Sequence, residues 1–154
     1  MVATVVQLEA ELIGLVKSVP SFSGMGFSVF DMDDFESKSS GVTLPVAGVV
    51  YDGLEPQGNQ VTSAGPAIGG ASLVVAQFVV VVAVQYSYTG SDDTKQQAFA
   101  LLDEVRGAVM GFKGVNTRPW RFIGERPELD SSGDGVAFYS QVWQSTLPIV
   151  GNPQ

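Results

Sequence analysis

Histidine and cysteine are absent from this chain, and with them the side chains that most often carry out catalysis or bind transition metals. An imidazole base, a thiolate nucleophile, a disulfide and a histidine-ligated metal are therefore excluded. Carboxylates remain for acid–base chemistry, and most of them stand in turns. Asp52 and Glu125 differ, because both follow strand-forming runs and could approach each other as a pair.

An acidic run at residues 31–36 invites comparison with a calcium-binding loop. In an EF-hand loop that starts at Asp31, the sixth residue should be glycine and the twelfth glutamate. This chain has Glu36 and Val42 at those positions. Because the spacing fails at both, we interpret the run as a solvated acidic loop.

Two glycine-containing segments imitate nucleotide-binding motifs. Residues 65–72 have the glycine spacing of a phosphate-binding loop, but Ala71 replaces the lysine and a strand follows where a helix is required. Gly24 and Gly26 lack the third glycine of the dinucleotide fingerprint, because Val29 occupies its position. We therefore expect no metal, nucleotide or other cofactor.

The composition indicates one domain, residues 1–154, with an unusual surface. The formal net charge of −8 argues against a phosphate-binding surface, which needs clustered Lys and Arg. Charged residues make up 16% of the chain, below the roughly 25% of an ordinary soluble domain. A surface with few charges can be covered by other subunits, so the composition favours an assembly.

The apolar run at residues 73–88 is the element around which the others are organised. Its valines are stiff in helices and suit strands, and a membrane helix would have to include Gly69 and Gly70 to reach about 18–20 residues. The run is apolar on both faces for most of its length. We therefore predict a strand that is covered on both faces.

The odd-numbered face of this strand is predicted to be a subunit interface. The two long helices have enough apolar surface to cover only one side of a sheet, and a second apolar face left in water would form a patch that monomers rarely expose. The residues assigned to this interface are Leu73, Val75, Gln77, Val79 and Val81.

Periodicity and turn residues place the remaining elements. Apolar residues at helical spacing predict helices over residues 3–19 and 92–112, and short apolar runs predict strands over 26–30, 42–51, 120–125 and 135–146. Asp52 and Gly53 are expected to end the second of these strands. The order predicts an α+β fold, a mostly antiparallel β-sheet with two main helices packed on one face.

Residues 54–72 are predicted to be a long glycine-rich loop, where about 4 to 6 residues would be typical of a connection. Ordering a residue costs about 1–2 kcal/mol, and few apolar side chains in this segment could offset that cost by burial. We expect the loop to become ordered on assembly, through contacts of Gln57, Gln60, Val61 and Ile68.

Three segments together carry a family resemblance: residues 46–53, residues 98–106 continuing to Phe112, and residues 120–126 followed by 135–139. Their combination resembles the small tail terminator proteins of tailed bacteriophages, including lambda-type terminators and their relatives in Mu-like phages. The element order agrees over nearly the whole chain. The long loop at residues 54–72 departs from the family pattern.

The resemblance implies a homo-oligomeric ring, usually a hexamer, that caps the tail tube, ends tail elongation and presents a surface to head-completion or neck proteins. Genomic DNA would pass through the lumen without specific binding, which suits an acidic protein. The expected location is the head-proximal end of the tail in the virion, after assembly in the host cytoplasm and without membrane contact. No catalytic residue is implied.

Other functions remain open. The chain could be another head–tail connector or neck protein. It could also be a small α+β enzyme that uses Asp52 and Glu125, or a monomeric binding module with a mobile glycine-rich loop. Light scattering separates a monomeric module from a ring.

Overall fold

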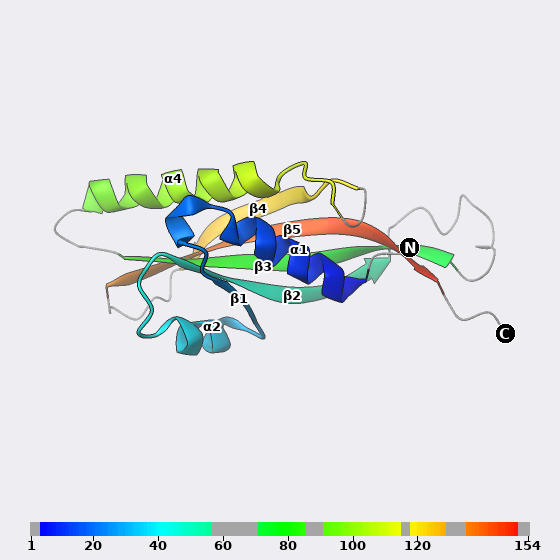
Figure 1. Cartoon of the computed structure of the whole chain (residues 1–154), viewed down its shortest axis with the longest axis horizontal. Coiled ribbons are helices and arrows are strands. Elements are labelled where there is room, and N and C mark those ends of the chain that lie inside the picture. The colour runs from blue at the N-terminus through cyan, green and yellow to red at the C-terminus, as the bar shows by residue number, and fades with distance from the viewer. Residues whose placement is uncertain (1–3, 57–70, 86–90, 115–117, 129–134, 151–154) are drawn as a thin grey trace.

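The computed structural model describes residues 4–56, 71–85, 91–114, 118–128 and 135–150, and these form an α+β fold on a five-stranded sheet (Figure 1). The strand order is β1-β2-β3-β5-β4, with β1 parallel to β2 and the other neighbours antiparallel. The predicted class and the mostly antiparallel sheet are confirmed. The elements are α1 (Val5–Lys17), the 3-10 turn η1 (Pro20–Phe22), β1 (Gly26–Val29), α2 (Met32–Ser39), β2 (Val46–Pro56), β3 (Ala71–Gln85), α4 (Ser91–Val109), β4 (Arg121–Glu128) and β5 (Val136–Val150).

β3 is the central strand, as its valine-rich sequence predicts. It pairs with β2 on one side and with β5 along its whole length on the other. Its even-numbered side chains Phe78, Val80 and Val82 are fully buried on the face that α1 and α4 cover. The last part of the predicted run, residues 86–88, lies outside the described residues.

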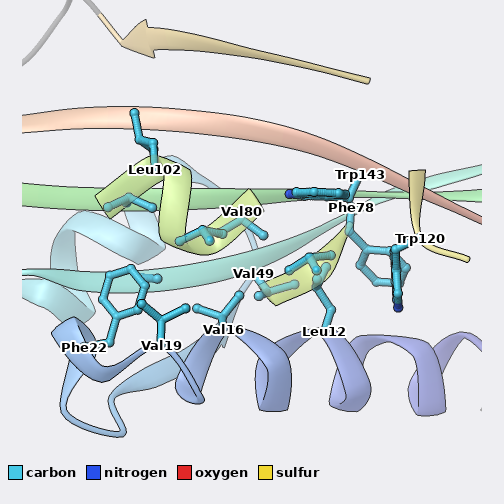
Figure 2. Packing of buried hydrophobic residues seen from close by; sticks show 14 of the residues in the cluster. Leu12, Val16, Val19, Phe22, Val49, Phe78, Val80, Leu102, Trp120 and Trp143 are labelled. Carbon is cyan, nitrogen blue, oxygen red and sulfur yellow. The ribbon is translucent and has the colours of Figure 1, made fainter. Parts of the chain in front are cut away.

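α1 begins at a capping box. The Thr4 side chain accepts a hydrogen bond from the Gln7 amide at 3.2 Å, and the Gln7 side chain accepts one from the Thr4 amide at 3.0 Å. Leu8, Leu12 and Val16 recur every four residues and are fully buried. Figure 2 shows Leu12 and Val16 directed from the helix towards the sheet. The predicted first helix is thus confirmed, with its apolar face in the core.

α4 covers the other part of the same face through Ala98, Leu101, Leu102, Val105 and Val109. The helix ends before Phe112, which is 42% exposed although the periodicity assigned it to the apolar face. After the helix, Gly111 adopts a positive φ of 77° and donates its amide to the Trp120 carbonyl at 3.1 Å. The Trp120 ring then packs edge-on against Phe78, with ring centroids 5.8 Å apart (Figure 2).

The acidic run is helical, so its interpretation as a solvated loop is wrong. Asp31 caps α2, because its carboxylate accepts a hydrogen bond from the Asp34 amide at 2.8 Å. Acidic residues in the first turn and Lys38 in the last turn both suit the helix dipole. Phe35 is the buried residue of this helix of 8 residues. One buried side chain gives too little periodicity to reveal a helix from sequence.

α2 packs on the second face of the sheet, so helices cover both faces rather than one. The Phe35 ring lies over Gly48, where an added Cβ would come within 2.6 Å of it. Val81, Ala83 and Phe138 complete a small second core around Phe35. In Figure 1, α2 lies below the strands and apart from α1 and α4. The prediction of two helices on one face holds for α1 and α4.

β2 continues through Asp52 and Gly53, so the prediction that these residues end the strand is wrong. Its register with β3 shifts between Tyr51 and Leu54, so the two intervening residues form a β-bulge. Gly53 has a φ of 107°, which explains the glycine at this position. The first residues of the predicted loop, Leu54 to Pro56, are therefore strand.

Candidate functional site

Asp52 and Glu125 do not form a carboxylate pair. Their strands, β2 and β4, are separated by β3 and β5, which places them about 14 Å apart at the usual strand spacing. They also lie on opposite faces. Asp52 contacts Gln77 on the second face, whereas Glu125 contacts Gln141 beneath α4. The fold therefore does not assemble the acid–base pair that the sequence left open.

Glu125 belongs to a polar cluster between α4 and the β4–β5 pair. The fully buried Gln141 donates its amide to the Leu102 carbonyl at 3.1 Å and to Glu125 at 2.8 Å. The Gln141 oxygen accepts a hydrogen bond from the Trp143 indole at 3.2 Å. Arg106 forms an ion pair with Glu125. Both polar atoms of the buried amide are satisfied, so the cluster attaches α4 to the sheet.

On the second face of the sheet, five apolar side chains in and beyond the rim of the cluster around Phe35 are only half-buried in the described structure. We call this region the open patch; it consists of Val50, Leu73, Val75, Val79 and Val142. Val50, Val79 and Val142 are in register on three neighbouring strands. They form a continuous apolar row across the face, because side chains of residues in register point to the same side.

A row of polar side chains crosses the open patch beside these valines. The Gln144 amide donates to the Gln77 oxygen at 2.8 Å, and the Gln77 amide donates to Asp52 at 2.6 Å. The β-bulge brings Asp52 onto this row. Arg121 of β4 is in register with Gln144 and extends the row to the far side of the sheet. The polar row, Asp52, Gln77, Gln144 and Arg121, therefore has a negative end on β2 and a positive end on β4.

The structure divides the residues that were predicted to form a subunit interface. Leu73, Val75 and Val79 belong to the open patch, and Gln77 stands in the polar row. Val81 is 3% exposed and packs in the second core, which leaves almost none of its surface for another subunit. The residues predicted to become ordered on assembly, Gln57, Gln60, Val61 and Ile68, lie outside the described residues.

Sequence reasoning missed Gln144 and Arg121. Each is a polar residue in a predicted strand, and nothing in its local sequence distinguishes it from any other solvent-facing position. Their place in the polar row depends on the register of β5 against β3 and of β4 against β5. Because this register joins residues far apart in the chain, no local pattern signals it.

Asp34 and Lys38 hold α2 beside the open patch. The Asp34 carboxylate accepts the Phe30 amide at 2.9 Å and lies 3.3 Å from the Lys38 ammonium. The hydrogen bond from Phe30, and then Lys38, lower the pKa of Asp34 below its ordinary value of 3.8. Lys38 also donates to the Ser28 carbonyl of β1 at 3.0 Å. These contacts attach α2 to β1 and to Phe30, the residue directly after that strand.

Among the described residues, no group of three or more Asp or Glu side chains is placed to hold a metal ion. The helices in this part of the chain are all too short or too polar to cross a membrane. No protein-family model matches the chain. A comparison with curated proteins likewise gives no match.

Proposed function

We propose that this chain is a structural virion protein of the tail-terminator type, which forms a hexameric ring on the end of a phage tail tube. The ring ends tail elongation and provides the surface for head–tail joining. The proposal is supported by the three segments that resemble these proteins. They correspond to β2, to α4 with its C-terminal turn, and to the β4–β5 pair.

The open patch is the observation that carries the proposal. Val75 and Val79 are half-buried, whereas Ala76, Phe78 and Val80 on the other face of the same strand are fully buried. The five side chains of the patch lie on three neighbouring strands, β2, β3 and β5, within a region about 14 Å wide at the usual strand spacing. Apolar side chains that gather on one face of a monomer can mark a contact with another protein. A neighbouring subunit that covers the patch would account for its valines.

The polar row makes this region suitable for burial in a protein contact. Burying an unpaired polar group costs about 1–3 kcal/mol. Gln77 and Gln144 are already hydrogen-bonded to each other, and Gln77 is bonded to Asp52. Covering these amides therefore leaves few polar atoms without a partner. The row lies between apolar side chains, so a second surface must place polar groups opposite the row and apolar groups opposite the valines. This requirement restricts the positions in which that surface can dock.

In this role the partners are other copies of the chain, the tail tube protein and a head-completion or neck protein. Genomic DNA passes through the lumen, and the net charge of −8 suits a wall that does not retain phosphate. The chain is assembled in the host cytoplasm and stays at the head-proximal end of the tail. Another head–tail connector or neck protein would use the same type of surface. The two functions differ in the particle to which the ring binds, which is the tail tube for a terminator and the neck for a connector.

Electron microscopy of the purified chain, with and without tail tubes of its phage, tests this proposal. We expect rings of uniform diameter at high protein concentration and a single ring at one end of each tube. Addition of the chain to polymerising tube protein should also stop tube growth. Binding to isolated necks but not to tubes would assign the chain to the connectors. A monomer that binds neither particle would contradict the proposal.

A further inference from the structure

Two exposed charges stand at opposite sides of the sheet at the ends of the polar row. Asp52 of β2 and Arg121 of β4 are both exposed, and neither takes part in an ion pair with another described residue. The hydrogen bond to Asp52 comes from the neutral amide of Gln77. In the part of the chain that the structure describes, each end of the row therefore presents a charge without an ion-pair partner, and the two charges have opposite signs.

Apolar surface adjoins each charge. On the β4 side, Ile123 lies at the register shift between Phe122 and Gly124 and is 45% exposed. On the β2 side, the half-buried Val50 and Val79 lie beside Asp52. The register of β1 with β2 ends at Val50, so within the described residues no strand pairs with the outer edge of β2 at Asp52. The β4 side of the sheet thus presents the positive charge of Arg121 next to the exposed Ile123. The β2 side presents the negative charge of Asp52 next to half-buried valines.

A rotation about an axis parallel to the strands brings these two sides together. Such a rotation keeps every residue at its height along the strands. Arg121 of one copy therefore meets Asp52 of the next at the same height, because both belong to one row. Repeated head-to-tail contacts of this kind close into rings. A two-fold axis running across the strands would instead place equal charges opposite each other.

We infer that Arg121 and Ile123 of one copy dock onto Asp52 and the neighbouring valines of the next copy. The inference rests on the proposed function, because it specifies how the open patch is covered in the ring. The ion pair joins the polar row of each subunit to that of its neighbour. The occupant of the Asp52 side of the open patch is therefore the β4 edge of a second copy.

Charge reversal and mixing test this contact. Asp52→Arg or Arg121→Asp alone places like charges across every contact, so each should raise the concentration needed for ring formation by about tenfold or more. An equal mixture of the two variants should form rings like the unmodified chain, because alternating copies pair opposite charges at every contact. In Asp52→Arg the Gln77 and Gln144 amides can turn over, so that the Gln77 oxygen accepts from the new guanidinium, and in Arg121→Asp the hydrogen bonds from Gln144 to Gln77 and from Gln77 to Asp52 stay as they are.

Two further variants serve as controls. Arg126→Asp makes the same charge change on β4 at a side chain that is 79% exposed and lies outside the contact, and it should leave ring formation unchanged. Ile123→Asp should prevent ring formation, and mixing with the other variants should not restore it. Thermal unfolding of each variant establishes that the subunit is still folded.

The outcomes separate this inference from the proposed function. If the unmodified chain forms rings and the single charge reversals form them equally well, the proposed contact is wrong. The contact is also wrong if the mixture of the two variants forms no rings. Neither result contradicts the proposal that the chain forms a ring. The mixture of variants could form rings although the rings of the unmodified chain never bind tube ends. This result would support the contact and contradict the tail-terminator function. A chain that stays monomeric at every concentration would contradict both.

Discussion

The two faces of the sheet carry similar valine-rich surfaces but are covered to different extents. On the face under α1 and α4, the core includes Leu8, Leu12, Phe78, Trp120 and Trp143, all at most 1% exposed. On the other face, α2 buries a small cluster around Phe35 and leaves Val50, Val75 and Val79 half-buried. The difference therefore comes from the covering helices rather than from the strands.

This difference indicates that the two faces of β3 have different roles. Its even-numbered side chains from Ala76 to Val82 contribute to folding, because close packing on all sides buries them fully. Of its odd-numbered side chains, Val81 and Ala83 are buried in the second core, whereas Val75 and Val79 are half-buried and keep surface available for a contact. In the proposed ring, one face of β3 thus belongs to the core, and the part of the other face around Val75 and Val79 belongs to a subunit contact.

The largest expected effect is on the packed face. Phe78→Ala should lower the free energy of unfolding by about 3–5 kcal/mol, because it removes a fully buried ring that packs on Trp120. Val79→Ala, on the next residue, should cost about 1 kcal/mol or less, since that side chain is only half-buried. Urea unfolding of both variants measures the contrast. Equal losses would mean that the two faces are equally packed in solution.

An intermediate effect is expected where α2 rests on the sheet. Gly48→Ala should lower the free energy of unfolding by about 1–3 kcal/mol, because the new Cβ would lie within 2.6 Å of the Phe35 ring. Gly107→Ala is the matched control, because its Cβ would meet no atom within 4 Å. In the helix α4 this control should stabilise by about 0.5–1 kcal/mol. The same loss in both variants would show that Phe35 does not seat on Gly48.

The smallest effect concerns the pH dependence of α2. Because the folded-state pKa of Asp34 is lowered, its carboxylate stabilises the fold above its ordinary pKa of 3.8, and this contribution is lost as the pH falls through the folded-state value. Asp34→Asn should therefore be less stable than the unmodified chain at pH 6, and the difference should shrink as the pH falls below 3.8. Unfolding curves between pH 6 and about 3 measure it. A difference that stays constant with pH would exclude Asp34 as its source.

Much of the fold was predictable from local pattern. The alternation of valines identifies β3, and the four-residue spacing of Leu8, Leu12 and Val16 identifies α1. These patterns are long enough for periodicity to determine the element type. The position of β3 between β2 and β5 follows from its apolar faces, because a strand covered on both faces belongs in the middle of a sheet.

The candidate site was predictable only in part. Val75 and Val79 could be assigned to a second apolar face, but Val81 lies beneath α2, a helix too short to show a period. Asp52 and Gly53 have the composition of a turn and instead form a bulge, which only pairing with β3 decides. Arg121 meets the polar row through a register that spans distant parts of the chain.

We propose that the open patch serves assembly more than folding, and Val79→Lys tests this most directly. We expect this variant to unfold within a few degrees of the unmodified chain, because a half-buried lysine can extend its charged end into water. It should nevertheless form no rings in light scattering and electron microscopy. Gln96→Lys, at an exposed position on α4, should fold and assemble normally. Rings of normal size from Val79→Lys, or loss of its fold, would contradict the claim.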